Sequence, residues 1–130
     1  MILFERAITA APEDIDELDH VNNAVWVSWI QEMATSHWQA RATPEQQAGY
    51  IWVVTRHEID YLRALRVGET VTARTWVGEA PRGARFDRHV EFTSPEGKVH
   101  VRAKTTWAVI DRASGRPLRV PADVTERFLA

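Results

Sequence analysis

Residues 22–41 can form one long helix, because no glycine or proline interrupts them. The polar side chains of this segment recur at helical spacing within a narrow arc: Ser28, Gln31, Glu32, Thr35 and Gln39. Large or apolar side chains are expected on the opposite side: Trp26, Trp29, Ile30, Met33 and Ala40. This apolar face is broader than that of most helices on a domain surface, so a sheet is expected to wrap around the helix. Thr43 and Pro44 mark its end.

After residue 50 the hydrophobic pattern changes from helical spacing to alternation. Strands are predicted at 51–62, 69–77, 85–92 and 99–109, and a first strand at 2–9. In the strand predicted at 51–62, one face is expected to carry Ile51, Val53, Thr55, His57, Ile59 and Tyr61. Gly and Pro turn signals separate the last four strands, which favours an antiparallel meander. The predicted fold class is α+β, a long central helix wrapped by a five-stranded antiparallel sheet.

Length and composition narrow the function classes. The 130 residues predict one domain, residues 1–130. Sixteen basic and eighteen acidic side chains give a net charge of −2, whereas nucleic-acid-binding proteins are usually basic, so no nucleic-acid partner is expected. The chain has no cysteine, which excludes cysteine nucleophiles and fits a cytoplasmic protein. Short apolar runs predict no membrane span, and the five histidines have no metal-binding spacing.

The loop before the helix is rich in acidic and amide side chains. Four carboxylates are followed by a histidine and two asparagines: Asp14, Asp16, Glu17, Asp19, His20, Asn22 and Asn23. Asp and Asn are favoured at helix N-termini, so a structural role is one interpretation. The first amides of a helix can also stabilise an oxyanion, and a nearby carboxylate could attack a carbonyl or activate a water.

The motif DxDxxxHVNNAxW at 14–26, together with the order of the predicted elements, resembles the hotdog-fold acyl-CoA thioesterases of the 4-hydroxybenzoyl-CoA thioesterase family. Weaker similarities lie at 58–63, 66–69, 107–111 and 115–117. Plant acyl-ACP thioesterases carry a similar DxDxxxHVNN. The resemblance covers nearly the whole chain. It implies hydrolysis of an acyl-CoA, or of an acyl carrier protein thioester, to a carboxylic acid without a cofactor.

The resemblance also implies roles for single residues. Asp16 lies where the family has its catalytic carboxylate, which acts as nucleophile or general base. The backbone amide of Asn23 lies where the thioester carbonyl is polarised. His20 is a second catalytic candidate, since its counterpart is implicated in catalysis in the plant enzymes, and Asn22 would hold the loop or bind near the thioester. Asp19 replaces a glycine of the closer relatives, so a positive φ there would be strained.

Arginines are implied as CoA ligands. In the family, basic residues near the hairpin around residue 83 and near the subunit junction bind the phosphates of CoA. The resemblance therefore implies surface contacts to CoA from Arg82 and Arg85, and also from Arg88 and Arg116. Strand 51–62 is expected to be a sheet edge, at which family members pair as homodimers, with homotetramers common.

Two alternatives to a thioesterase remain. A hotdog enoyl-CoA hydratase would use an Asp–His pair, but its loop has Asn-Pro before the His. Here no proline lies between Asp16 and His20, and these two residues are one position closer in sequence than the Asp and His of such a hydratase. A non-catalytic acyl-CoA-binding module would bind the thioester without releasing thiol. His37 and His57 fall on predicted apolar faces and are expected to be hydrogen-bonded core residues.

Overall fold

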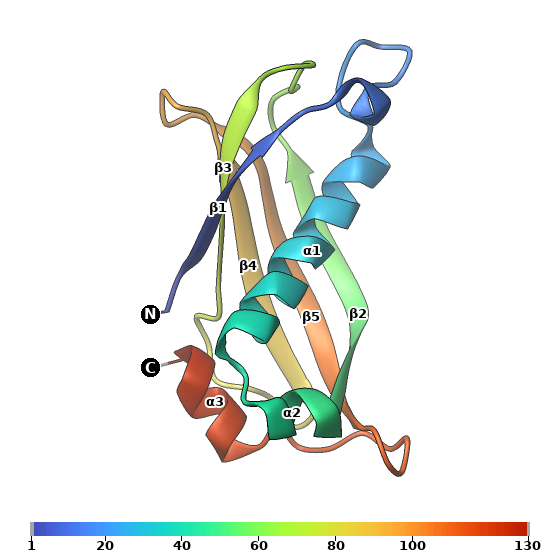
Figure 1. The fold of residues 1–130 in the computed structure, drawn as a ribbon, viewed down its shortest axis with the longest axis vertical. Coiled ribbons are helices and arrows are strands. Elements are labelled where there is room, and N and C mark those ends of the chain that lie inside the picture. The colour runs from blue at the N-terminus through green and yellow to red at the C-terminus, as the bar shows by residue number, and fades with distance from the viewer. Residues whose placement is uncertain (1, 130) are drawn as a thin grey trace.

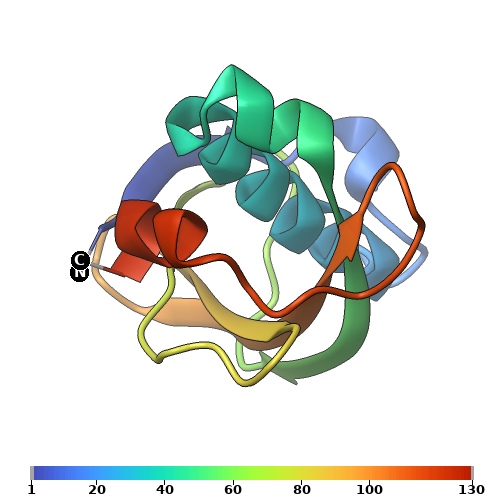
Figure 2. The same cartoon turned by 90° about the horizontal axis from the view of Figure 1, so that it is seen from below.

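The computed structural model describes residues 2–129. Figure 1 shows one long helix lying across the concave face of a curved sheet, and Figure 2 shows the sheet wrapping around it. The elements follow in the order β1 (Phe4–Thr9), a 3-10 turn η1 (Pro12–Asp14), α1 (Asn23–Arg41), α2 (Pro44–Gly49), β2 (Tyr50–Tyr61), β3 (Thr70–Trp76), β4 (Arg85–Thr93), β5 (Val99–Asp111) and α3 (Ala122–Leu129).

The five strands form one sheet in the order β1-β3-β4-β5-β2, with every neighbouring pair antiparallel. The register sets Phe4 opposite Thr75 and Thr9 opposite Thr70, so β1 ends beside the start of β3. This arrangement confirms the predicted α+β class. It also confirms that β2 is an edge strand, since β2 pairs only with β5 among the elements described.

The predicted face of β2 is wrong over half of the strand. A bulge between Val54 and Arg56 shifts the register against β5. Before the bulge, Ile51 and Val53 are 36% and 42% exposed on the outer face. After it, Ile59 packs against the core under α1. One extra residue in a strand reverses the side-chain alternation, so a strict period of two cannot hold across the bulge.

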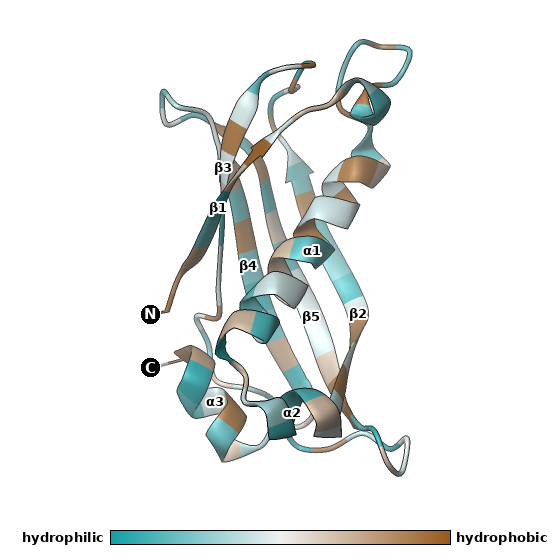
Figure 3. Ribbon diagram, in the orientation of Figure 1, coloured by the Kyte–Doolittle hydropathy of each residue, from teal (hydrophilic) through white to brown (hydrophobic). Residues whose placement is uncertain are grey.

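Helix α1 buries the face expected from its sequence. Trp26, Trp29, Ile30 and Met33 are all buried, whereas Ala40 near the C-terminal end is exposed, contrary to prediction. Trp26 packs edge-on against Trp29 and against Phe92 of β4, with ring centroids 5.1 and 5.0 Å apart. Figure 3 shows hydrophobic residues recurring along α1 and along the strands that it crosses.

Helices α2 and α3 were not predicted. In α3, Val124 and Phe128 are four residues apart and buried, which is the spacing of an amphipathic helix. They form a second hydrophobic cluster with Val77 and Phe86, packed against half-buried aromatic residues that include Trp38. The core therefore has two parts, one beneath the N-terminal half of α1 and one between its C-terminal half and α3.

Candidate active site

The loop that enters α1 folds back on itself between Asp16 and His20. The Asp16 amide donates to the His20 carbonyl at 2.9 Å, and the Asp19 amide donates to the Asp16 carbonyl at 3.0 Å. The Val21 amide donates to the carbonyl of Leu65 at 2.8 Å, which fixes the loop to the segment after β2. The two candidate catalytic residues therefore occupy facing positions of one closed turn.

Asp19 closes this turn in a left-handed conformation. Its φ is 65°, and it is the sole non-glycine residue with positive φ in the 2–129 range. The position at which the resemblance expects glycine therefore has positive φ in this chain. The Asp19 carboxylate lies 2.9 Å from Arg66 Nη1, but both side chains are exposed. An exposed pair of this kind contributes at most about 1 kcal/mol, so the turn carries a net strain.

Substitution of Asp19 tests that strain. Asp19→Gly is expected to raise the free energy of unfolding by about 0.5–1 kcal/mol, because glycine adopts positive φ without a Cβ clash. Asp19→Val is expected to lower it by about 1–2 kcal/mol, since a β-branched residue is disfavoured there. Urea unfolding of both variants measures these changes. Equal stability of the two variants would contradict the assignment of strain to this position.

The N-terminus of α1 leaves one amide available to a ligand. The Asn22 side chain caps the helix, with Oδ1 accepting from the Ala24 amide at 2.8 Å. The amides of Val25 and Trp26 donate to the Asn22 carbonyl. Within the described chain, the amide of Asn23 has no acceptor. Asn22 is thus a cap residue, and the Asn23 amide points away from the helix with an unused hydrogen.

The Asp16 side chain is half-buried and held by its own turn. Oδ1 accepts from the Leu18 amide at 2.9 Å, while Oδ2 has no donor among residues 2–129. His20 is also half-buried. At the same end of the molecule, the Tyr61 hydroxyl lies 3.5 Å from the Asn23 carbonyl, so the end of β2 borders the helix N-terminus. One carboxylate oxygen and one amide hydrogen are therefore available at this end of α1.

Three of the four candidate CoA arginines lie at the opposite end of the protomer. Arg82 is in the β3–β4 hairpin, Arg85 begins β4, and Arg116 follows β5; all three are exposed. The β3–β4 hairpin and the turn after β5 lie at the end of the sheet where α2 and α3 lie, opposite the loop that enters α1 (Figure 1). Arg82 Nη1 contacts Asp87 Oδ2 at 2.8 Å, and this hydrogen bond is the main cause of the lowered pKa of Asp87. Within one chain the structure does not bring these arginines to Asp16.

The expectation that Arg88 lies on the surface is wrong. Arg88 is 8% exposed and faces inward from β4. Nη1 donates to His37 Nδ1 at 2.8 Å and to Thr75 Oγ1 at 3.1 Å. The alternation of β4 contains the signal that was missed, because position 88 is in phase with the buried residues Phe86 and Val90.

Burial and the Arg88 contact together keep His37 neutral. Burial, followed by the charges of Arg88 and Arg41, lowers the pKa of His37 to about 3. Neutral His37 accepts at Nδ1 and carries its hydrogen on Nε2, which is buried and has no acceptor in the described chain. The expected core role of His37 is therefore confirmed. His57 is half-buried, and its Nδ1 lies 2.8 Å from Oγ1 of Thr105 on β5.

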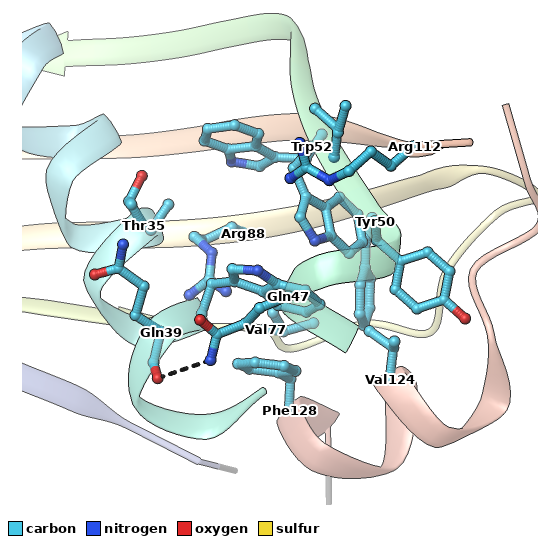
Figure 4. Close-up of a pocket in the computed structure, with 15 residues that line it drawn as sticks. Thr35, Gln39, Gln47, Tyr50, Trp52, Val77, Arg88, Arg112, Val124 and Phe128 are labelled. Atoms are coloured by element: carbon cyan, nitrogen blue, oxygen red, sulfur yellow. Dashed lines mark hydrogen bonds between the residues drawn. The ribbon is translucent and has the colours of Figure 1, made fainter. Parts of the chain in front are cut away.

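A cavity of about 300 Å³ opens between the C-terminal half of α1, β2 and α3 (Figure 4). Aromatic and aliphatic side chains form most of its walls, and Arg88 lies among them. A broader depression of about 580 Å³ lies beside the entering loop, where Arg63, Arg66, Lys98 and His100 contribute basic groups. Asp16 lines neither of these spaces. The basic residues beside the loop therefore come from the 62–69 segment and the β4–β5 turn. None of these residues is among the arginines expected to bind CoA.

Residues 2–129 contain no group of three His, Asp or Glu side chains arranged to hold a metal ion. Of the described helices, none combines the length and the hydropathy needed to span a membrane.

Comparisons with known proteins identify the family and the fold. A family model described as the thioesterase-like superfamily matches residues 10–128. The palmitoyl-acyl carrier protein thioesterase of Gossypium hirsutum is 30% identical over 104 residues, which is 73% of this chain, and the chain spans 25% of the length of that relative.

Two solved structures share the fold. A 1,4-dihydroxy-2-naphthoyl-CoA thioesterase from Synechocystis has a TM-score of 0.81 at 15% identity, covering 96% of this chain and 94% of that one. The protein SAV2348 from Staphylococcus aureus, solved in complex with CoA, has a TM-score of 0.84 at 16% identity, covering 97% and 81%.

Proposed function

Because the chain belongs to the thioesterase-like superfamily, we propose that it hydrolyses an acyl thioester at the N-terminus of α1. This membership confirms the resemblance to hotdog thioesterases. The proposed substrate is an acyl-CoA or an acyl carrier protein thioester, and the products are a carboxylic acid and the free thiol. A relative named for acyl carrier protein substrates and a similar structure in complex with CoA support this substrate class.

One observation carries the proposal: the Asp16 carboxylate lies in a closed turn that leads directly to the unused amide of Asn23. The Asn23 amide N–H would donate a hydrogen bond to the thioester carbonyl oxygen, and the partial positive charge at the helix N-terminus would stabilise the oxyanion that forms on attack. The half-buried Asp16 carboxylate of the entering loop would supply the base or the nucleophile. His20, across the same turn, can assist in proton transfer.

Two routes fit these groups. As a general base, Asp16 takes a proton from water while the hydroxide oxygen bonds to the carbonyl carbon. The tetrahedral oxyanion then collapses, the C–S bond breaks, and the thiolate takes up a proton. As a nucleophile, Asp16 forms a C–O bond and expels the thiolate, and water then hydrolyses the mixed anhydride. Both routes use the Asn23 amide in the same way.

A dimer through β2 would reconcile the loop with the distant arginines. β2 is an edge strand of 12 residues, and its Tyr61 end borders the helix N-terminus. Antiparallel pairing of β2 with the β2 of a second copy would set the Tyr61 end of one protomer beside the Tyr50 end of the other. The end that carries Arg82, Arg85 and Arg116 would then lie toward the entering loop of the second copy. CoA phosphates would contact these arginines at the junction.

Incubation with a panel of acyl-CoAs of different length and aromaticity tests the proposed function. Release of free thiol from at least one of them is expected. Crotonyl-CoA separates the alternatives, since a hydratase would remove the enoyl absorbance without releasing thiol. Tight binding of acyl-CoA with neither reaction would indicate a non-catalytic acyl-binding module and would contradict hydrolysis.

The dimer is tested by sedimentation equilibrium. A mass of twice the chain, or of four times the chain if dimers pair further, is expected at micromolar concentration, because a long uncovered edge strand favours pairing. Arg56→Pro in β2 removes a backbone donor in mid-strand and is expected to weaken the assembly at least tenfold. A wild-type protein that sediments as a monomer while hydrolysing thioesters at full rate would contradict an active site completed by a second copy.

A further inference from the structure

A group of arginines surrounds the C-terminal half of α1 without a carboxylate partner. It consists of Arg41, Arg88, Arg112 and Arg127. Within residues 2–129 none of these four lies within 4.0 Å of a carboxylate, although several other arginines of the chain form ion pairs. Arg41 and Arg127 instead donate to each other's backbone carbonyls. None of these four charges therefore has a carboxylate in direct contact within the described chain.

Arg88 is the buried member of this group. Its Nη1 is engaged by two neutral acceptors, His37 and Thr75, and its guanidinium carbon lies 5.9 Å from the centre of the Phe128 ring. Nε and Nη2 have no acceptor within the described chain. Burial lowers the pKa of Arg88 to about 10, so the group is still charged at neutral pH. A buried charge without a counter-charge is destabilising, and such a site favours the binding of an anion.

The cavity around Arg88 is chemically matched to an apolar anion. Its lining includes two arginines, Arg88 and Arg112, and no Asp or Glu. Most of the remaining wall is aromatic or aliphatic: Trp38, Tyr50, Trp52, Val77, Phe86, Trp107, Val124 and Phe128. Figure 4 shows the Arg88 side chain reaching into the space between Thr35 on one side and Phe128 on the other. A volume of about 300 Å³ is within the range of small-molecule sites.

We propose that this cavity binds the carboxylate of an apolar or aromatic organic acid, with Arg88 as the anion-binding group. The planar guanidinium suits a carboxylate, and the aromatic walls suit its hydrocarbon body. Thr35 at the cavity lies twelve residues after Asn23, about 18 Å along the helix, so within one protomer the cavity is separate from the thioester-cleaving end of α1. In the proposed β2 dimer, the Tyr50 end that lines the cavity would instead lie toward the entering loop of the second copy. Such a carboxylate has two sources, a free organic acid or the far end of an acyl chain that carries a terminal carboxylate; the second source rests on the proposed function.

Titration calorimetry with matched free ligands tests the site without any need for hydrolysis. Octanoate and 1-naphthoate are compared with octanamide and 1-naphthamide. At least one acid is expected to bind about ten- to a hundredfold more tightly than its amide, because a charge-assisted hydrogen bond replaces a neutral one. Arg88→Met is expected to abolish this preference and Arg88→Lys to retain part of it. The matched control is Arg102→Met, which removes the same charge from an exposed pair with Glu91 and should leave the preference unchanged.

Hydrolysis assays distinguish the second source. Suberyl-CoA, which carries a terminal carboxylate, is compared with octanoyl-CoA. If the acyl chain supplies the carboxylate, kcat/KM for suberyl-CoA is expected to be at least about tenfold higher, with the advantage lost in Arg88→Met and kept in Arg102→Met. A free-acid preference without a suberyl-CoA preference would assign the site to free acids. Acid binding in a protein that hydrolyses no thioester would overturn the proposed function and leave the anion site standing.

The proposal fails if neither acid is preferred over its amide and neither thioester is preferred over the other. It also fails if a preference exists but persists unchanged in Arg88→Met. Should Arg88→Met not fold, the test uses the wild-type protein and its folded Arg88→Lys variant. The 15Nε–1Hε resonance of Arg88, identified by its loss in Arg88→Lys, is expected to shift on addition of the preferred acid and not on addition of its amide. An unshifted Arg88 resonance under saturating acid would exclude the site.

Discussion

Asp16→Asn is expected to reduce thioester hydrolysis by about a thousandfold while acyl-CoA binding changes little. The substitution removes the carboxylate that we propose as base or nucleophile and leaves the Asn23 amide in place. The fold should survive, because the amide oxygen of asparagine can still accept from Leu18, as Asp16 Oδ1 does at 2.9 Å. A loss of kcat with unchanged binding would separate catalysis from recognition.

The matched control is Glu17→Gln, which neutralises the exposed neighbouring carboxylate in the same loop and is expected to retain full turnover. His20→Ala tests the second candidate and is expected to lower kcat by a smaller factor, about ten to a hundred, if His20 assists proton transfer. Acyl-CoA binding is measured by calorimetry and turnover by thiol release. Full activity in Asp16→Asn would disprove the assigned role of this carboxylate.

Acidification is expected to destabilise the protein through His37. The group titrates near 6.5 when unfolded and at about 3 when folded, so the unfolded chain takes up the proton first. The stabilisation is complete above pH 6.5 and is lost as the pH falls toward 3. At about 1.4 kcal/mol per pH unit, protonation of His37 is expected to lower the free energy of unfolding by roughly 2 kcal/mol between pH 6.5 and pH 5. Protonated His37 would face the Arg88 guanidinium across a contact of 2.8 Å in the core.

Urea unfolding at pH 7.5 and pH 5.0 measures this effect. His37→Gln supplies an oxygen that can accept from Arg88 but does not titrate. Between pH 7.5 and pH 5.0, the free energy of unfolding of this variant should therefore fall by about 2 kcal/mol less than that of the wild type. His89→Gln is the control, since the His89 side chain is half-buried and its Nε2 lies 2.9 Å from Glu79, not in contact with Arg88. Burial also lowers the pKa of His57, but His57 is present in all three proteins. Identical pH dependence in wild type and His37→Gln would refute the role given to His37.

Local patterns predicted most of the architecture. The helix at 22–41 and the five strands lie within two residues of the observed elements, because each depends on a periodicity that a single segment carries. The face of β2 was not predictable in the same way. Its alternation reverses at the bulge between Val54 and Arg56, and the bulge is fixed by pairing with β5, not by the strand's own residues.

The candidate site shows the same division. The turn from Asp16 to His20, the cap at Asn22 and the positive φ at Asp19 are local features, because each depends on hydrogen bonds or backbone torsions within a few residues. The burial of the arginines, by contrast, was not predictable from neighbouring residues. Arg82 and Arg88 are six residues apart, yet one is exposed beside Asp87 and the other is buried beside His37.

The sequence alone determined the element types, the order of the elements and the loop that precedes α1, because hydrophobic period and helix capping act over a few neighbouring residues. Only the tertiary structure decided that Arg88 enters the core, that α3 closes one side of the cavity beside it, and that the entering loop and the exposed arginines lie at opposite ends of the protomer. Those relations join residues that are tens of positions apart, and they depend on strand order and register, which no single segment specifies.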